Sequence, residues 1–146
     1  MTNEEVVRNY AAAHMSQDHD ALGALRHPEW TSVWPQSGEL LRGTQNDRRM
    51  IESYPGGAPR VVAQERLIGS EDRWGLSPFG GMYRVAGEGE NWWGEWRMIY
   101  PDGRTYLVVI LMELRDGKIY RETLYWPEPF DPPAWRAEFV ERLPGA

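Results

Sequence analysis

The sequence predicts an α+β protein in which about three N-terminal helices pack on a strongly curved antiparallel sheet. Helix caps and helix-spaced apolar residues are confined to the part before residue 58, whereas β-type runs joined by tight turns fill the chain from residue 60. A length of 146 residues is typical of one domain, so we expect a single domain over residues 1–146.

The helices are predicted from the residues at their ends. Thr2 and Glu5 have the spacing of a capping box, which begins a helix that runs to about Met15. A second helix is expected over residues 20–25 and ends before His27-Pro28. We expect a third helix with Thr44 as its N-cap, closed by residues 55–57, and a last one that begins near Pro133 and carries Trp135, Phe139 and Val140.

The strands are predicted from β-type runs between turn residues. Residues 101–103 (Pro-Asp-Gly) and 116–117 (Asp-Gly) are strong hairpin signals. We therefore expect strands over residues 30–34, 40–41, 60–68, 82–86, 91–100, 104–115 and 118–126, with residues 73–78 as a loop or a short edge strand.

The two turns predict how the long strands pair, and this register predicts which side chains share each face of the sheet. Closure at residues 116–117 places Glu122 opposite Leu111, and closure at residues 101–103 places Glu95 opposite Val109. Because side chains alternate along a strand, one face would carry Trp93, Glu95, Arg97, Ile99, Leu107, Val109, Leu111, Glu122, Leu124 and Trp126. The other would carry Trp92, Trp96, Met98, Tyr100, Tyr106, Val108, Ile110, Met112, Thr123 and Tyr125.

Both faces are apolar, so we expect both to be covered. The helices would cover the first face and enclose a pocket. The second face, through Trp92, Trp96, Tyr106 and Tyr125, is expected to form a homodimer.

Three charged residues stand out on the predicted pocket face. Charges are rarely buried unless they are paired or functional, and an apolar pocket with a few polar groups is the usual form of a small-molecule site. Glu95 is the expected general base, Glu122 its assistant and Arg97 the group that orients an oxyanion. The alternative for all three is a structural salt-bridge cluster.

Further residues are expected to line the pocket and bind substrate: Tyr10, His14, Trp34, Gln36, Trp93 and Trp126. Each has a structural alternative, because tryptophans and tyrosines fill cores and Gln36 can cap a turn. Three histidines without ligand spacing make a metal site improbable, and no cofactor is expected.

The charge and composition of the chain argue against some classes of binding partner. The net charge of −6 and a pI near 5.1, without a basic run, argue against nucleic acid and anionic membranes. The chain has no cysteine, no signal-like N-terminus and no run of about 18 apolar residues, so a cytoplasmic location is expected.

The segments WTSVWPQSGELLRG (residues 30–43) and YLVVILMELRDGKIYRETLYW (residues 106–126), in this order of elements, resemble the nuclear transport factor 2-like superfamily. The closest resemblance is to its SnoaL-like and ketosteroid-isomerase-like members. It implies a cone-shaped α+β fold that encloses a pocket, and usually a homodimer.

The catalytic groups of these members match this sequence only in part. Ketosteroid-isomerase-like members have a carboxylate where this chain reads Val33-Trp34-Pro35-Gln36. Epoxide-hydrolase-like members use an Asp–Arg–Asp group, of which Glu95 matches one acid, while Trp93 and Leu124 stand at the other two positions. SnoaL-like cyclases use an Asp and a His in the pocket, and His14 is the candidate for the histidine.

The expected function is acid–base chemistry on a small apolar organic substrate, by an isomerase, cyclase, hydratase or epoxide-hydrolase-like enzyme. Two alternatives remain open: a non-catalytic module that binds a lipophilic metabolite, and a dimeric scaffold domain.

Overall fold

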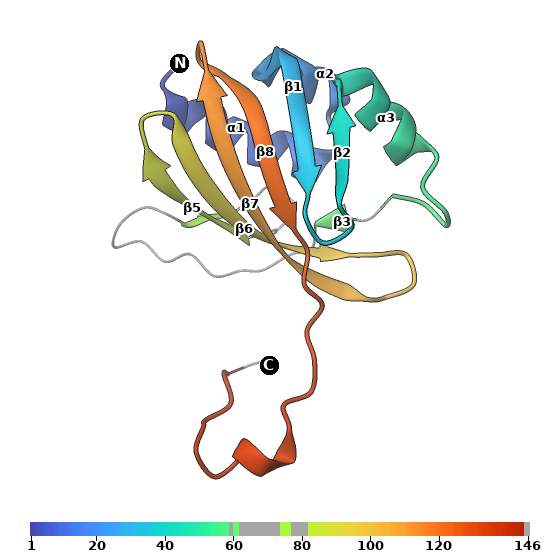
Figure 1. Ribbon diagram of the computed structural model, residues 1–146, viewed down its shortest axis with the longest axis vertical. Helices are drawn as coiled ribbons and strands as arrows, with labels where there is room; N and C mark the ends of the chain where they lie inside the picture. Colours follow the sequence, from blue (N-terminus) through green and yellow to red (C-terminus); the bar gives the residue numbers. More distant parts are fainter. Residues whose placement is uncertain (59, 62–73, 77–81, 145–146) are drawn as a thin grey trace.

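The computed structural model describes residues 1–58, 60–61, 74–76 and 82–144, and for residues 60–61, 74–76 and 82–86 it describes the backbone alone. Figure 1 shows the first helix behind a twisted sheet and the third at the side of the sheet. The helices are α1 (Asn3–Ser16), α2 (His19–Leu25) and α3 (Thr44–Glu52), followed near the C-terminus by a 3₁₀ turn, η1 (Ala134–Arg136). The strands are β1 (Arg26–Trp34), β2 (Glu39–Arg42), β3 (Arg60–Val61), β4 (Trp74–Leu76), β5 (Met82–Glu88), β6 (Asn91–Ile99), β7 (Thr105–Arg115) and β8 (Lys118–Tyr125).

The helix ends agree with the predicted caps at α1 but differ at both ends of α3, whose C-cap is Ser53, ahead of the predicted residues 55–57. Thr2 and Glu5 form the complete capping box of α1, and Gln17 ends the helix in the left-handed conformation. For α3 the N-cap is Gly43 and not Thr44, which becomes the first helical residue. Gly43 has a φ of 86°, a conformation that glycine adopts without strain.

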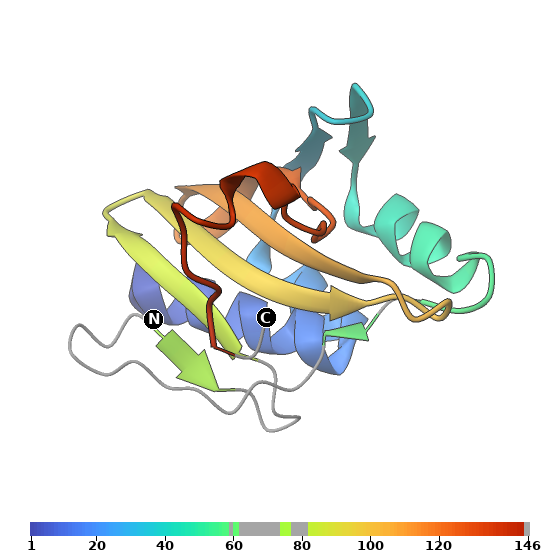
Figure 2. The same cartoon turned by 90° about the horizontal axis from the view of Figure 1, so that it is seen from below.

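The strands form one mixed sheet in the order β2-β1-β8-β7-β6-β5-β4, with β3 paired to β6. Neighbouring strands are antiparallel except for β1 and β8, which pair in parallel and bring Ser32 beside Glu122. Figure 2 shows the sheet curving over α1 and α2. Of the predicted strands, residues 62–68, 73 and 77–78 lie outside the described residues.

The predicted register is confirmed between β6 and β7, where Glu95 lies opposite Val109 and Arg97 opposite Leu107. Between β7 and β8 it is wrong beyond the turn. Leu114 pairs with Ile119 but Glu113 pairs with Arg121, so Tyr120 is an extra residue in β8. This bulge moves every later residue of β8 to the opposite face.

The structure corrects two predictions about the faces, the first of them through the bulge. Glu122 lies opposite Met112 and is buried under the helices, on the face opposite to Glu95 and Arg97. The helices cover the face that carries Trp92, Trp96, Val108, Ile110 and Met112, all of which are buried in one chain. Trp92 and Trp96 therefore cannot form the predicted subunit interface, because both are buried in one core with the apolar side of α1.

We call the opposite side of the sheet the open face. It carries Trp93, Glu95, Leu107, Val109, Leu111, Thr123 and Tyr125. Leu107, Leu111 and Tyr125 are exposed there.

The predicted last helix is reduced to the three-residue turn η1. Residues 127–144 leave the sheet and extend away from it (Figure 1). A short helix without a packing partner gains too little from its backbone hydrogen bonds to form. Among the described residues, no helix is both long and apolar enough to cross a membrane.

Candidate active site

A chain of buried polar side chains crosses the interior between the helices and the sheet. The Tyr10 hydroxyl donates to Glu122 Oε2 at 2.8 Å and accepts from Arg26 Nε at 2.8 Å. Arg26 Nη1 donates to Asp47 Oδ2, also at 2.8 Å. Arg26 of β1 thus bonds to α1 and α3 directly and is connected to β8 through Tyr10, with its side chain only 1% exposed.

Local sequence explains how each member reaches the interior. Tyr10 lies on the buried side of α1 with Val6, Val7 and Ala11. Asp47 is the buried residue of α3, in its first turn, where a negative charge is favoured by the helix dipole. Ser32 of β1 hydrogen-bonds Glu122, and Trp34 Nε1 donates to the Ser32 hydroxyl at 2.8 Å.

Burial sets the protonation of these groups. Burial raises the pKa of Glu122 above its usual value, although Arg26 and the hydrogen bonds from Tyr10 and Ser32 oppose the rise. Burial also raises the pKa of the Tyr10 hydroxyl well above its usual value, so Tyr10 stays protonated. Burial by itself would lower the pKa of Arg26, but Tyr10 and the charges of Glu122 and Asp47 outweigh it, and the net pKa is raised.

Next to this chain lies a largely enclosed cavity of about 70 Å³. It is lined by His14, Gln17, His19, Leu22, Asp47, Ile51, Trp96 and Met98. Three of these side chains matter chemically: Asp47, held by Arg26, and the rings of His14 and Trp96, whose centroids are 5.1 Å apart.

Two shielded polar atoms belong to residues that line this cavity. His14 Nε2 and Trp96 Nε1 are buried and have no hydrogen-bond partner within the described part of the chain. Burial lowers the pKa of His14 well below its usual value, and the charge of Arg26 lowers it further, so the ring is neutral at neutral pH. The cavity therefore combines a neutral imidazole, an indole N–H donor and a carboxylate.

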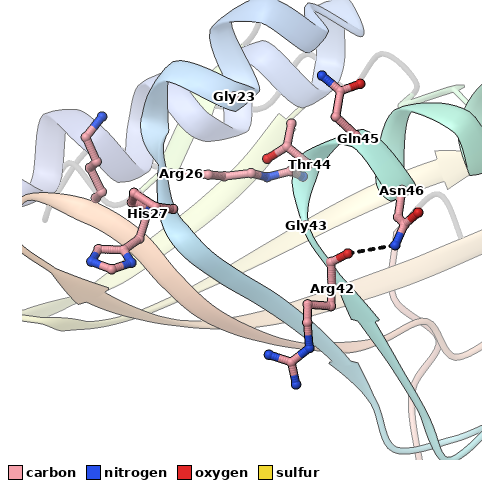
Figure 3. Close-up of a pocket in the computed structure, with 10 residues that line it drawn as sticks. Gly23, Arg26, His27, Arg42, Gly43, Thr44, Gln45 and Asn46 are labelled. Carbon is pink, nitrogen blue, oxygen red and sulfur yellow. Dashed lines mark hydrogen bonds between the residues drawn. The ribbon is translucent and has the colours of Figure 1, made fainter.

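A larger groove of about 520 Å³ lies at the start of α3 (Figure 3). Of the buried polar side chains described above, Arg26 lines it. Figure 3 shows the Arg26 side chain extending from β1 toward Thr44, and the Asn46 side chain bonded to the Arg42 carbonyl oxygen. The groove is open to solvent, and Lys118 at its edge already donates to the Ala24 carbonyl oxygen. It lacks the enclosed, convergent polar atoms of the inner cavity.

The structure brings only some of the predicted site residues together. Tyr10, His14 and Glu122 meet in the interior. Glu95, Arg97 and Trp93 lie on the open face, so they cannot act with Glu122. Trp34 and Trp126 form an edge-to-face pair, with centroids 5.7 Å apart, and Gln36 Oε1 accepts from the Trp126 backbone N–H at 2.6 Å.

Sequence reasoning missed three residues of the site. Arg26 and Asp47 lie in polar stretches and resemble surface charges, and no local signal separates them from their exposed neighbours. Trp96 was assigned to an interface, although its alternation with Trp92 correctly placed both on one face. Among the described residues, no group of three or more His, Asp or Glu side chains could hold a metal ion.

Comparison with known proteins identifies similar structures. No protein-family model matches the chain, and no curated protein matches it significantly. A nuclear transport factor 2-like protein of unknown function from Burkholderia xenovorans is 28% identical, with 97% of this chain and 94% of that chain covered and a TM-score of 0.71.

Two further solved structures share the fold. A candidate ketosteroid isomerase from Kribbella flavida is 22% identical, with 97% of this chain and 90% of that chain covered and a TM-score of 0.71. A candidate polyketide cyclase from Sinorhizobium meliloti is 14% identical, with 86% and 100% covered and a TM-score of 0.57. At these identities the likeness concerns the fold.

Proposed function

We propose that this chain, which has the nuclear transport factor 2-like fold, is an enzyme of the isomerase or cyclase kind. It would move a proton on a small organic molecule bound beside His14, Trp96 and Asp47. The observation that carries the proposal is that two residues lining one cavity, His14 and Trp96, each have a buried ring nitrogen (Nε2 and Nε1) with no hydrogen-bond partner among the described residues. Buried polar atoms are almost always hydrogen-bonded, so this pair supports a ligand that bonds to both rings.

The roles follow from the chemistry of each group. Neutral His14 accepts a proton from the carbon next to a substrate carbonyl and returns it at another position. The Trp96 N–H donates to the carbonyl oxygen and stabilises the negative charge that develops there. Asp47 accepts a hydrogen bond from a hydroxyl or enol of the substrate, and its own position is set by Arg26.

Glu122 and Tyr10 act through Arg26 in this scheme, because neither lines the cavity. They hold the guanidinium in place, and its positive charge adds to the larger effect of burial, which lowers the pKa of His14. They are positioning residues. The resemblance to SnoaL-like cyclases implies an Asp and a His in the pocket and offered His14 alone; Asp47 as the acid is part of this proposal.

The size of the cavity limits the substrate. Ligand pockets usually have about 300–1,000 Å³, whereas this cavity has about 70 Å³. Liquid water occupies about 30 Å³ per molecule, so the cavity matches a group of only a few heavy atoms. We therefore propose a small carbonyl compound, or the reactive end of a larger one, as the substrate.

The test measures proton abstraction directly, on a panel of simple carbonyl compounds. The protein is incubated in D₂O with small ketones, β-keto acids and enones, and deuterium incorporation beside the carbonyl is followed by NMR. We expect His14→Gln to lower the exchange rate by about 100-fold or more, since general-base catalysis contributes about 10²–10⁴. Trp96→Phe removes the N–H donor but keeps an aromatic ring, and is expected to lower it by about 100-fold.

Two variants that carry the same types of substitution at other positions serve as controls. His27→Gln and Trp135→Phe change one histidine and one tryptophan that do not line the cavity, and both should exchange at the wild-type rate. Exchange at the spontaneous rate for every compound, or equal rates for wild type and His14→Gln, contradicts the proposal.

A second candidate function, binding without turnover, is favoured by the small size and aromatic wall of the cavity. It predicts that a compound of the panel raises the melting temperature of the wild type but not of Trp96→Phe, while no deuterium enters the compound.

A cytoplasmic location of the protein stays a prediction.

A further inference from the structure

The segment from Pro127 to Pro144, which we call the C-terminal arm, exposes large apolar side chains. Phe130, Trp135 and Phe139 are 78%, 74% and 73% exposed, and Val140 and Leu143 are exposed as well. The arm extends away from the rest of the molecule in Figure 1. Five large apolar side chains on one short segment are unusual for a surface that faces water, and such patches commonly mark protein–protein contacts.

The start of the arm is fixed to the sheet, and the stretch that follows is stiff. The Pro127 carbonyl oxygen accepts from the Leu107 N–H at 2.8 Å, which anchors the start of the arm beside β7. Pro127, Pro129 and the pair Pro132-Pro133 follow within seven residues. Each proline fixes its own φ and disfavours a helical turn at the residue before it, so this stretch is stiff and extended. A sharp reversal that returns the arm to its own sheet is therefore disfavoured.

The open face of the sheet offers a complementary surface. A groove of about 370 Å³ on it is lined by Trp93, Leu111, Glu113 and Thr123, among others. Leu111 is 45% exposed, and Leu107 and Tyr125 continue the apolar strip along β7 and β8. The groove and the arm are thus two apolar surfaces of one chain that do not meet within it.

We propose that two copies of this chain exchange their C-terminal arms, so that Trp135 and Phe139 of each copy pack into the groove around Trp93 and Leu111 on the open face of the other. The occupant of the open face is a second copy because both surfaces exist on every chain, and a two-fold axis then satisfies both at once.

The surface that the exchanged arms would bury is large enough for a stable dimer. A large aromatic side chain buries about 150–250 Å², so the exposed parts of the three aromatic side chains with Val140 and Leu143 amount to roughly 600 Å² for each arm. Two exchanged arms and the surfaces that they cover would bury roughly 2,400 Å², at or above the roughly 1,200–2,000 Å² of a standard interface. This proposal is independent of the proposed reaction, because the arm does not line the inner cavity.

The test uses the absence of cysteine from the chain. Glu138→Cys places one thiol on the arm, and Glu113→Cys places one at the groove on a second, tagged chain. After the two proteins are mixed and equilibrated, a short bis-maleimide should link them into a heterodimer of distinct mass. A matched pair of Glu138→Cys with Asp20→Cys, on α2, should give no such product.

The double variant Glu113→Cys/Glu138→Cys separates the two possible occupants. At low protein concentration, a link within one chain would show that the arm covers its own sheet and would overturn the proposal. Absence of the heterodimer product in the mixture would overturn it as well.

Light scattering on the eluting protein measures the consequence for assembly. We expect a dimer for the wild type and for Glu138→Gln/Glu141→Gln, and a monomer with an unchanged far-ultraviolet spectrum for Trp135→Ser/Phe139→Ser. A monomeric wild type, or a Trp135→Ser/Phe139→Ser variant that is still a dimer, would show that the arm does not form the interface.

Discussion

Replacing Tyr10 by phenylalanine removes one oxygen atom from the centre of the buried polar chain. That oxygen donates to Glu122 Oε2 and accepts from Arg26 Nε, both at 2.8 Å. The phenylalanine ring fits the same space, so the change is almost purely electrostatic. It leaves one carboxylate oxygen and one guanidinium N–H buried without their partner.

The expected loss of stability can be worked from these two bonds. A hydrogen bond to a charged group contributes about 1.5–3 kcal/mol, and breaking a buried charged network commonly costs about 3–5 kcal/mol. We expect Tyr10→Phe to lower the free energy of unfolding by about 3–5 kcal/mol. With a urea dependence of about 2 kcal/mol per M for a chain of this size, the midpoint of unfolding should fall by about 2 M.

The assay is urea unfolding at pH 8, followed by tryptophan fluorescence and by circular dichroism. Tyr54→Phe is the matched control, because its hydroxyl makes one longer bond of 3.3 Å to the Tyr100 hydroxyl at a half-buried position. We expect the control to lose about 1 kcal/mol or less. If the free energy of unfolding of Tyr10→Phe lies within 1 kcal/mol of the wild-type value, the view that the buried polar side chains hold α1 to the sheet is refuted.

Three further predictions test other parts of the structure. The folded-state pKa of His14 is lowered below its usual value of 6.5, so the unfolded chain binds this proton first as pH falls. The free energy of unfolding should therefore decrease below pH 6.5, by up to about 1.4 kcal/mol per pH unit. Between pH 7.5 and 5.5 the urea midpoint should fall less for His14→Phe than for the wild type, and an equal fall in both proteins would contradict the lowered pKa. Asp47→Asn removes the directly bonded ion-pair partner of buried Arg26 and should cost about 3 kcal/mol by chemical unfolding; a loss below 1 kcal/mol would show that the pair is dispensable. Gly87→Ala places a methyl group against the Asn91 backbone at a φ of 138° and should cost about 3 kcal/mol, whereas Gly89→Ala, with φ at 59° and open space, should cost about 1 kcal/mol; equal melting temperatures for the two variants would contradict the close approach at Gly87.

Much of the fold follows from local signals that the sequence carries. The capping box at Thr2 and Glu5 begins α1 as predicted, and the turns at residues 101–103 and 116–117 connect the predicted long strands. From the first of these turns the register of β6 and β7 could be predicted residue by residue. These features are local, because a cap or a two-residue turn depends on the conformations of only a few residues.

The candidate site could be predicted only in part. Tyr10, His14 and Glu122 were identified because polar groups on apolar stripes are conspicuous in a sequence. Arg26 and Asp47 were not, since a charge in a polar segment becomes buried only when α3 docks beside β1. Glu95 and Arg97 looked equivalent to Glu122 until the bulge at Tyr120 separated their faces.

By itself, therefore, the sequence determined most of the elements, the capping box of α1, the two hairpin turns and which residues of one strand share a face. Each of these depends on a few neighbouring residues or on the backbone periods of 3.6 and 2. The tertiary structure alone decided which face the helices cover and on which side of the sheet Glu122 lies. One extra residue in β8 reverses that side, and its cost or benefit depends on what Glu122 meets there: Tyr10 from α1, Ser32 from the parallel strand β1, and the charge of Arg26. Those partners come from distant parts of the chain, so no local pattern around Glu122 could specify them.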